Sequence, residues 1–437
     1  MSIAVPGPSP RDDHERLPTM TEAPATGRTT LIRGARVLTM DAAGNEHDRA
    51  DILVSGGRIA AIATDLAPPP GAEVVEAGGM LAMPGLVNAH VHSPGNLMRG
   101  GLDGLPLEIF MLHEVPPLSA GTPVKRLNYV RTMLGAVEML KLGITAVQDD
   151  AFHVPVASAE GIDGIMEAYR DSGIRATVAI DQPNVVEYEK YPFLRDLLPE
   201  PLRRRMDEAP RQSMEELAAL YAHLVERWHK SAGGRLMAAV SCSAPQRVTD
   251  DYFAHLSALS RGLDLPFYIH ILETKLQRVL GEEKYGKSLV RHVHDMGFLD
   301  ERMMVVHAIW IDDADIALLA EAGCTVAHNP ISNLRLGSGV MPFRKLRDAG
   351  VPICLGTDEA TTDDTHNLWG AAKLAGMIHS LADPDYRTWP RAPEILEAAT
   401  RGGAGAMRAR GRLGELVPGA EADIILVDLD TLPFTPL

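Results

Sequence analysis

The residues best suited to chemistry are polar side chains at the ends of apolar, strand-like runs of the sequence. His90 and His92 end the run LVNAHVH, His270 lies at the end of PFYIHI, and Asp358 ends PICLGTD. Residues two apart on a strand point to the same face, so His90 and His92 would face one site. Two histidines on one face, a third histidine and a carboxylate form an open metal site that leaves one position for water. The pattern therefore predicts that these four residues hold one divalent ion.

Two further polar residues lie near the same strand ends. His307 is at the end of RMMVVHA, and Glu273 follows His270 by three residues. A divalent ion can lower the pKa of a bound water to about 7, and a nearby carboxylate can pass that water's proton to a leaving amine. The plainer alternatives are a core histidine for His307, a surface carboxylate for Glu273 and a helix cap for Asp358. Zinc is the first candidate for the ion, with iron, cobalt and manganese as alternatives.

These residues need a scaffold in which distant strand ends meet. Continuous apolar runs are typical of parallel strands buried on both faces, and helical stretches separate the runs here. Eight such repeats match the size of a (β/α)8 TIM-type barrel, whose active sites lie at the C-terminal strand ends. We therefore predict an α/β fold with a catalytic barrel over residues 83–404. Its expected strands are 86–92, 144–150, 175–180, 235–244, 266–271, 302–308, 324–330 and 352–358.

The segments on either side of the barrel differ from it in pattern. Residues 30–82 and 405–437 are β-like, with a Gly-Gly turn inside the first segment, and we expect them to form one small β-sandwich. Residues 1–29 are rich in Pro, Thr and charge, which predicts a disordered tail. The chain stops soon after the second β segment, so we expect either a truncated C-terminus or a smaller sandwich than usual.

Composition excludes several kinds of partner. The formal net charge of −16 argues against binding to a nucleic-acid backbone or to anionic lipid. Cys242, Cys324 and Cys354 are far apart, which favours buried free thiols over disulfides or a thiolate metal site. The N-terminus lacks the apolar core of a signal peptide, and no stretch approaches the ~20 apolar residues that span a membrane. We expect a cytoplasmic protein that binds a small molecule.

Several segments resemble the motifs of the amidohydrolase superfamily. They are PGLVNAHVHSPGNLMRG, HILET, VVHAIWIDDADIALLAEAGCTVAHNPISNLRLGSGVMP and GVPICLGTD, in the order found in that superfamily. The most similar branch contains the cytosine, guanine and adenosine-type deaminases and the triazine hydrolases. The resemblance implies the metal ligands His90, His92, His270 and Asp358, a proton shuttle at Glu273, and a group at His307 that polarises or positions water or substrate.

The resemblance also bears on the number of metal ions and on assembly. Binuclear members of the superfamily use a carbamylated lysine on the fourth strand, where this chain has VSCSAP. The missing lysine favours a single ion. The resemblance further implies a sandwich beside the barrel and, in many members, a homodimer or larger homo-oligomer.

Substrate contacts are predicted less directly. Arg99 could meet a carbonyl or ring nitrogen, Trp310 could wall the pocket, and His153, past the second strand, could reach it. For these the alternatives are a surface salt bridge or simple packing. We also place His328 and Asn329 in the pocket. The alternative for these two residues is a side chain that braces the loop, and for Asn333 the two roles are equal alternatives. Residues 186–205 form a long aromatic and charged segment that could cover the mouth.

The leading hypothesis is hydrolytic deamination of a nitrogen heterocycle of purine, pyrimidine, pterin or triazine type. The alternative keeps the metal and changes the bond: cleavage of a urea, carbamate, thiocarbamate or amide, or displacement of chloride or an alkylamine from a ring. A third hypothesis is a binding protein whose metal is only structural. Glu359 departs from the deaminase pattern, because it adds a negative charge next to the predicted ligand Asp358.

Overall fold

Two parallel sheets make up the centre of the molecule. The computed structural model describes residues 27–116, 118, 121, 124–191 and 193–434. All eight predicted runs contain strands, although the fourth run, 235–244, is divided between two short strands. The first sheet has the order β6-β7-β8-β9 and the second the order β10-β11-β12-β13-β14. The strands are β6 (Leu86–Val91), β7 (Ile144–Phe152), β8 (Arg175–Asp181), β9 (Leu236–Ala238), β10 (Val240–Ser241), β11 (Phe267–Ile271), β12 (Met303–His307), β13 (Thr325–His328) and β14 (Ile353–Leu355).

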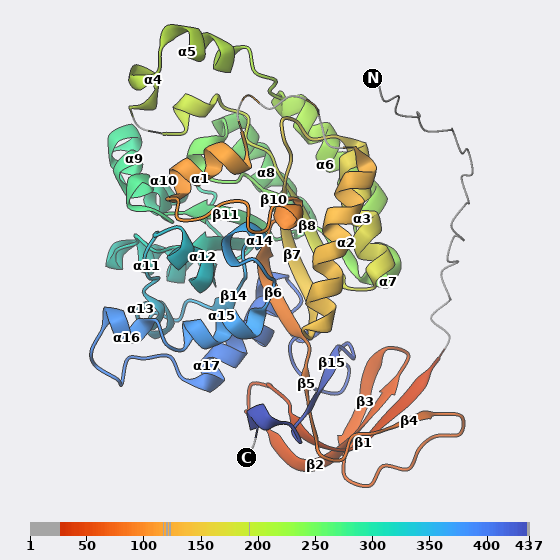
Figure 1. Ribbon diagram of the computed structural model, residues 1–437. Coiled ribbons are helices and arrows are strands. Elements are labelled where there is room, and N and C mark those ends of the chain that lie inside the picture. The colour runs from red at the N-terminus through yellow and green to blue at the C-terminus, as the bar shows by residue number, and fades with distance from the viewer. Residues whose placement is uncertain (1–26, 117, 119–120, 122–123, 192, 435–437) are drawn as a thin grey trace, which may run out of the picture.

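Helices follow the strands and cover the outside of the sheets (Figure 1). Their ends are set by local sequence signals: the Ser158 hydroxyl accepts a hydrogen bond from the Gly161 amide at the start of α3, and Gly173, with φ 86°, ends that helix. The parallel pairing places the carboxyl ends of the strands at one end of the molecule, as the predicted site requires. The main helices are α2 (Lys125–Lys141), α3 (Ala159–Ser172), α6 (Met214–Trp228), α8 (Asp250–Leu263), α9 (Lys275–Tyr285), α10 (Leu289–Asp295), α11 (Asp313–Ala322), α13 (Phe343–Asp348), α15 (Leu368–Ala375) and α17 (Ala392–Glu397).

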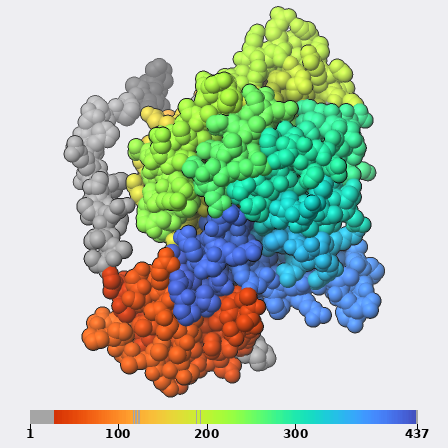
Figure 2. Space-filling view, turned by 180° about the vertical axis from the view of Figure 1, so that it is seen from behind, coloured from red at the N-terminus to blue at the C-terminus, as the bar shows by residue number. Residues whose placement is uncertain are grey.

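The terminal segments come together in a second, smaller body. Figure 2 shows the N-terminal strands, in red and orange, against a C-terminal segment in blue. The described residues there form a six-stranded sheet of order β15-β5-β1-β2-β3, with β4 paired to β1, and the β-sandwich stays a prediction. Leu416 and Ala420, from the loop before β15, pack in its apolar core. The strands are β1 (Thr29–Leu38), β2 (Glu46–Ser55), β3 (Arg58–Ala63), β4 (Glu73–Glu76), β5 (Met80–Pro84) and β15 (Ile424–Asp428).

The cysteines, the helices and the N-terminal tail bear on the predictions made for the chain as a whole. Cys242, Cys324 and Cys354 are buried free thiols, as predicted. No helix among the described residues is long and apolar enough to cross a membrane. The predicted tail, residues 1–29, lies almost wholly outside the described residues.

Candidate metal centre

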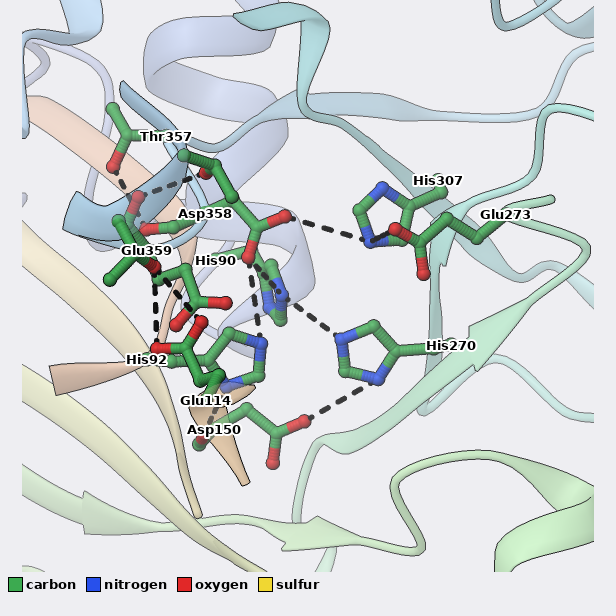
Figure 3. Close-up of polar contacts among 12 residues, drawn as sticks. His90, His92, Glu114, Asp150, His270, Glu273, His307, Thr357, Asp358 and Glu359 are labelled. Atoms are coloured by element: carbon green, nitrogen blue, oxygen red, sulfur yellow. Dashed lines mark hydrogen bonds and ion pairs between the residues drawn. The ribbon is translucent and has the colours of Figure 1, made fainter. Parts of the chain in front are cut away.

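Four of the predicted residues meet at the carboxyl ends of the parallel strands. Figure 3 shows His90, His92, His270 and Asp358 pointing toward one another from separate parts of the chain. The Nε2 atoms of His90 and His92 each lie 3.5 Å from Oδ1 of Asp358. Nε2 of His270 lies 3.2 Å from Nε2 of His90. All four side chains are buried, so residues as far apart in the chain as positions 90 and 358 share one enclosed site.

These spacings fit a single zinc ion. Two zinc–nitrogen bonds of about 2.0–2.1 Å at a tetrahedral angle hold their nitrogens about 3.3 Å apart. The separations of 3.2 and 3.5 Å around His90 match this value. Ring nitrogens that face each other at 3.2 Å repel one another unless a proton or a cation lies between them. Three imidazoles and a carboxylate are also a donor set that zinc accepts.

The backbone fixes two of the imidazoles so that Nε2 faces the site. Nδ1 of His92 is 2.5 Å from the carbonyl oxygen of Asp150, and Nδ1 of His270 is 2.8 Å from that of Ser243. In a neutral imidazole, the ring nitrogen that donates to a carbonyl carries the hydrogen, which leaves Nε2 with a free electron pair. Metal-binding histidines are commonly oriented by such bonds.

The electrostatics favour a cation at this point. Burial lowers the pKa of His90 to about 4, so its ring is neutral and able to act as a ligand at pH 7. Burial also acts to lower the pKa of His92, but the carboxylates of Asp358, Asp150 and Asp181 outweigh it and raise that pKa to about 9. The same carboxylates would attract a bound metal ion.

Glu273 and His307 lie beside the four residues, on the opposite side from Glu114 and Glu359 (Figure 3). Nε2 of His307 is 3.6 Å from Oε1 of Glu273 and 3.7 Å from Oδ2 of Asp358. Burial raises the pKa of the Glu273 carboxyl above its usual value. Nδ1 of His307 donates to Oδ1 of Asn333 at 2.8 Å, so Asn333 orients that ring.

The backbone adopts an unusual, left-handed conformation at several residues in and beside this site. Ser243, Leu272, His307 and Asp358, all at or just after strand ends, have φ values of 61°, 52°, 72° and 60°. Non-glycine residues rarely adopt this left-handed region, and each instance costs on the order of 1–3 kcal/mol. Strain of this kind concentrates at functional sites, because the fold must hold the side chain where chemistry requires it.

A cavity opens from the four-residue centre toward solvent. It contains about 1180 Å³ of atom-free space, a value that includes open solvent at its mouth. His153, one of the predicted substrate contacts, lines it, as do Glu273 and His307. The walls combine apolar side chains such as Leu107, Phe152 and Val186 with charged ones, namely Glu114, Asp181, Lys190, Arg211, Arg247 and Glu359.

Four other predicted substrate contacts lie outside the lining of this cavity. Arg99 turns away because its guanidinium binds the carboxylate of Glu138, 39 positions along the chain. Trp310 donates its indole N–H to the Ser338 carbonyl at 2.8 Å, which holds the ring in the loop. His328 packs against the ring of His379, and Asn329 is wholly buried beside it. Arg99 thus forms an ion pair and Trp310 is held in its loop, whereas the polar side-chain atoms of His328 and Asn329 have no hydrogen-bond partner among the described residues.

The predicted cover segment does reach the cavity. Residues 186–205 contain η2 (Glu187–Glu189), α4 (Leu194–Leu197) and the first part of α5 (Glu200–Asp207). Val186, Lys190 and Tyr191 line the cavity. Figure 1 places α4 and α5 at the end of the molecule opposite the terminal sheet.

Several residues at the site were not predicted from the sequence. Asp150 and Asp181 lie at the ends of their strands, so the rule that found the histidines could have found them. Together with His92 they form one of three close groups of possible ligand atoms; the other two are His90, His92 and Asp358, and His90, His270 and His307. Glu114 carries no such signal, because it ends a short helix, α1 (Leu107–Glu114), that only the tertiary fold brings to the site.

The fold and the donor set define a metal-dependent hydrolase. The model of the Amidohydrolase family matches residues 81–436. The chain belongs to that family, as its motifs indicated.

Three relatives illustrate the range of this family. A 5-methylthioadenosine/S-adenosylhomocysteine deaminase from Symbiobacterium thermophilum is 32% identical over 93% of this chain and 86% of its own length. The structure of an adenosine deaminase from Xanthomonas campestris with bound zinc has a TM-score of 0.80 and 28% identity, and covers 93% of this chain and 86% of its own. The structure of an atrazine chlorohydrolase from Arthrobacter aurescens complexed with zinc has a TM-score of 0.84 and 27% identity, and covers 93% of this chain and 89% of its own.

Proposed function

We propose that this enzyme hydrolytically deaminates a nitrogen heterocycle of purine, pyrimidine, pterin or triazine type, releasing ammonia. The observation that carries the proposal is the meeting of His90, His92, His270 and Asp358 beside Glu273 in one cavity. The deaminases among its relatives support the choice of reaction, since they act on adenosine derivatives.

In the proposed mechanism each residue has one task. His90, His92, His270 and Asp358 would hold a zinc ion, which would supply a Lewis acid that activates the attacking water. Glu273 takes the proton of the attacking water and delivers it to the departing nitrogen. His307, held by Asn333, orients the oxygen that is added to the ring carbon. The carbon–nitrogen bond breaks, and the products are the hydroxylated or oxo ring and ammonia.

A substrate panel tests this proposal. Zinc-loaded protein is incubated with adenosine derivatives, other purines, pyrimidines, pterins and amino-triazines, and ammonia is measured by a coupled assay. We expect release from at least one class, at a rate that falls to background after chelation of the metal. Absence of ammonia from every class, in a preparation with one zinc per chain, would contradict the proposal.

The second candidate is displacement of chloride or an alkylamine from a triazine ring. The similarity to the atrazine chlorohydrolase structure favours it, because the same centre can direct water at a ring carbon with a different leaving group. Chloride and amine release from chlorotriazines, measured beside ammonia release, separates the two candidates. We give less weight to cleavage of a urea, carbamate, thiocarbamate or amide, because among these relatives none is named for it.

We also propose that the two parallel sheets close into one (β/α)8 barrel over residues 83–404. The amide of Asp358 donates to the carbonyl of His90 at 2.9 Å, which links the chain after β14 to β6. The Ala239 amide, between β9 and β10, donates to Val178 in the first sheet. Small and apolar side chains from both sheets share one interior cluster, as a barrel interior requires: Ala89, Ala179, Ala239, Tyr268, Met304, Val306, Ala327 and Cys354. On this division, segments 30–82 and 405–437 form the second domain.

We further propose a homo-oligomer in the cytoplasm. Helix α2 exposes an apolar stripe at spacings of three and four residues: Leu127, Val130, Leu134, Val137 and Leu140. Such spacing presents a single seam that a second copy of the helix could cover. We expect light scattering to give a dimer or larger assembly, and Leu134→Glu to shift it toward monomer, whereas the surface change Glu215→Gln leaves it intact. A monomeric wild-type protein would contradict this.

A further inference from the structure

The cavity contains a pair of buried acids that the proposed reaction does not use. Glu114, at the end of α1, is 3% exposed, and Glu359, directly after Asp358, is 6% exposed. Both line the cavity, beside the metal centre and across it from Glu273 (Figure 3). The two carboxyl groups lie close to each other, and burial together with this neighbourhood raises the pKa of Glu359.

The chain around the pair is built to accommodate both carboxyl groups. A Cβ atom at Gly95 would lie 2.8 Å from Oε2 of Glu359 and 2.9 Å from Oε1 of Glu114, so any larger residue there would displace them. The hydroxyl of Thr361 donates to Oε2 of Glu114 at 3.1 Å. No N–H or hydroxyl among the described residues donates to Oε2 of Glu359, although that atom is buried. A buried acceptor without a donor points to a group supplied from outside the chain.

The pair also lacks a positive partner. Some other partly or wholly buried acids of this protein bind an arginine: Glu138 binds Arg99, Asp315 binds Arg278, and Glu394 binds Arg344. In the part of the chain that the structure describes, no lysine or arginine forms an ion pair with Glu114 or Glu359, the ring of His92 is a basic group near Glu114, and the acid Asp358 directly precedes Glu359. Buried charge is normally paired, because an unpaired ion loses its hydration without compensation.

We propose that Glu114 and Glu359 bind a cationic, amidinium- or guanidinium-type nitrogen group of the substrate beside the metal centre. The inference rests on the proposed function and narrows its substrates to nitrogen-rich molecules that carry such a group. A planar N–H pair matches two carboxylate oxygens and supplies both the missing donors and the missing positive charge. A second metal ion is less suitable, because neither glutamate belongs to a group of described ligand atoms close enough to share one.

Binding of two small probes tests the proposal without any need for turnover. Benzamidinium and benzamide have nearly the same shape but differ in charge and in the number of N–H donors. Their dissociation constants are measured by calorimetry with zinc-loaded wild type, Glu359→Gln and Glu114→Gln. The matched control is Glu215→Gln, which removes an exposed carboxylate that does not line the cavity. Zinc content is measured for each protein, because Glu359 adjoins a proposed ligand.

We expect wild type and Glu215→Gln to bind benzamidinium at least about tenfold more tightly than benzamide, and both cavity variants to lose most of that preference. Equal binding of the two probes by wild type would overturn the proposal, and this outcome does not depend on whether a variant folds. An unchanged preference in zinc-loaded Glu359→Gln would also overturn it. Because no product is measured, this result is independent of the ammonia assay, so the failure of one proposal is distinguishable from the failure of the other.

Discussion

Glu273→Gln is expected to retain its zinc and its fold and to lose about 10²–10⁴-fold in kcat. The amide keeps the size of the carboxylate and its place beside His307, but it cannot accept and release the proton of the attacking water. Glu273 is buried and only 3% exposed, so bulk water cannot readily replace it. The measurement is steady-state kinetics on the best substrate of the panel, with zinc content and melting temperature determined alongside.

The control for this variant is Glu283→Gln on α9, an exposed glutamate ten positions further along the chain. It should match wild type in kcat, zinc content and melting temperature. Turnover by Glu273→Gln within about threefold of wild type would show that another group carries the proton. A loss of zinc from that variant would instead place Glu273 among the metal ligands.

Asp358→Asn is expected to weaken zinc binding and to abolish turnover together. Asp358 contributes the only carboxylate of the proposed ligand set, and its Oδ1 lies 3.5 Å from Nε2 of both His90 and His92. Loss of a supporting residue around a metal typically costs 10–100-fold in affinity, and loss of a ligand should cost at least about as much. Competition with a coloured chelator measures the affinity of each protein for zinc.

Chelation of the wild-type enzyme provides an independent test of the same prediction. Activity should disappear with the metal and return when one equivalent of zinc is restored. Asp313→Asn, an exposed acid on α11, serves as the control and should bind zinc as wild type does. Full activity in metal-free protein, or unchanged zinc affinity in Asp358→Asn, would contradict the account.

The strands and the central site could be predicted from the sequence, because both follow simple patterns in the spacing of apolar and polar residues. Parallel strands buried on both faces are continuously apolar, so a polar residue such as His270 or Asp358 at the end of a run stands out. The HVH spacing fixes the shared face of His90 and His92 from strand geometry alone. The family model and the computed structure agree with this interpretation of the fold class and the enzyme class.

The outer parts of the site depend on partners that no local pattern reveals. Arg99 lies only seven positions after His92, yet its direction is set by Glu138 on α2. Trp310 follows His307 closely, but the carbonyl of Ser338 holds its ring outside the cavity. Glu114 reaches the site from a separate helix. The terminal segments show the same limit: the strand pattern predicts strands, but their pairing depends on long-range contacts, and here β15 pairs with β5 of the N-terminal segment.

The most direct test is an anomalous diffraction measurement at the zinc edge on crystals of the purified enzyme. The account predicts one strong peak per chain, about 2.0–2.2 Å from Nε2 of His90, His92 and His270 and from one carboxylate oxygen of Asp358. It also predicts that Glu273 and His307 do not bind the ion directly. No peak at this point, a second peak between Asp150 and Asp181, or a peak ligated by His307 in place of His92 would contradict it.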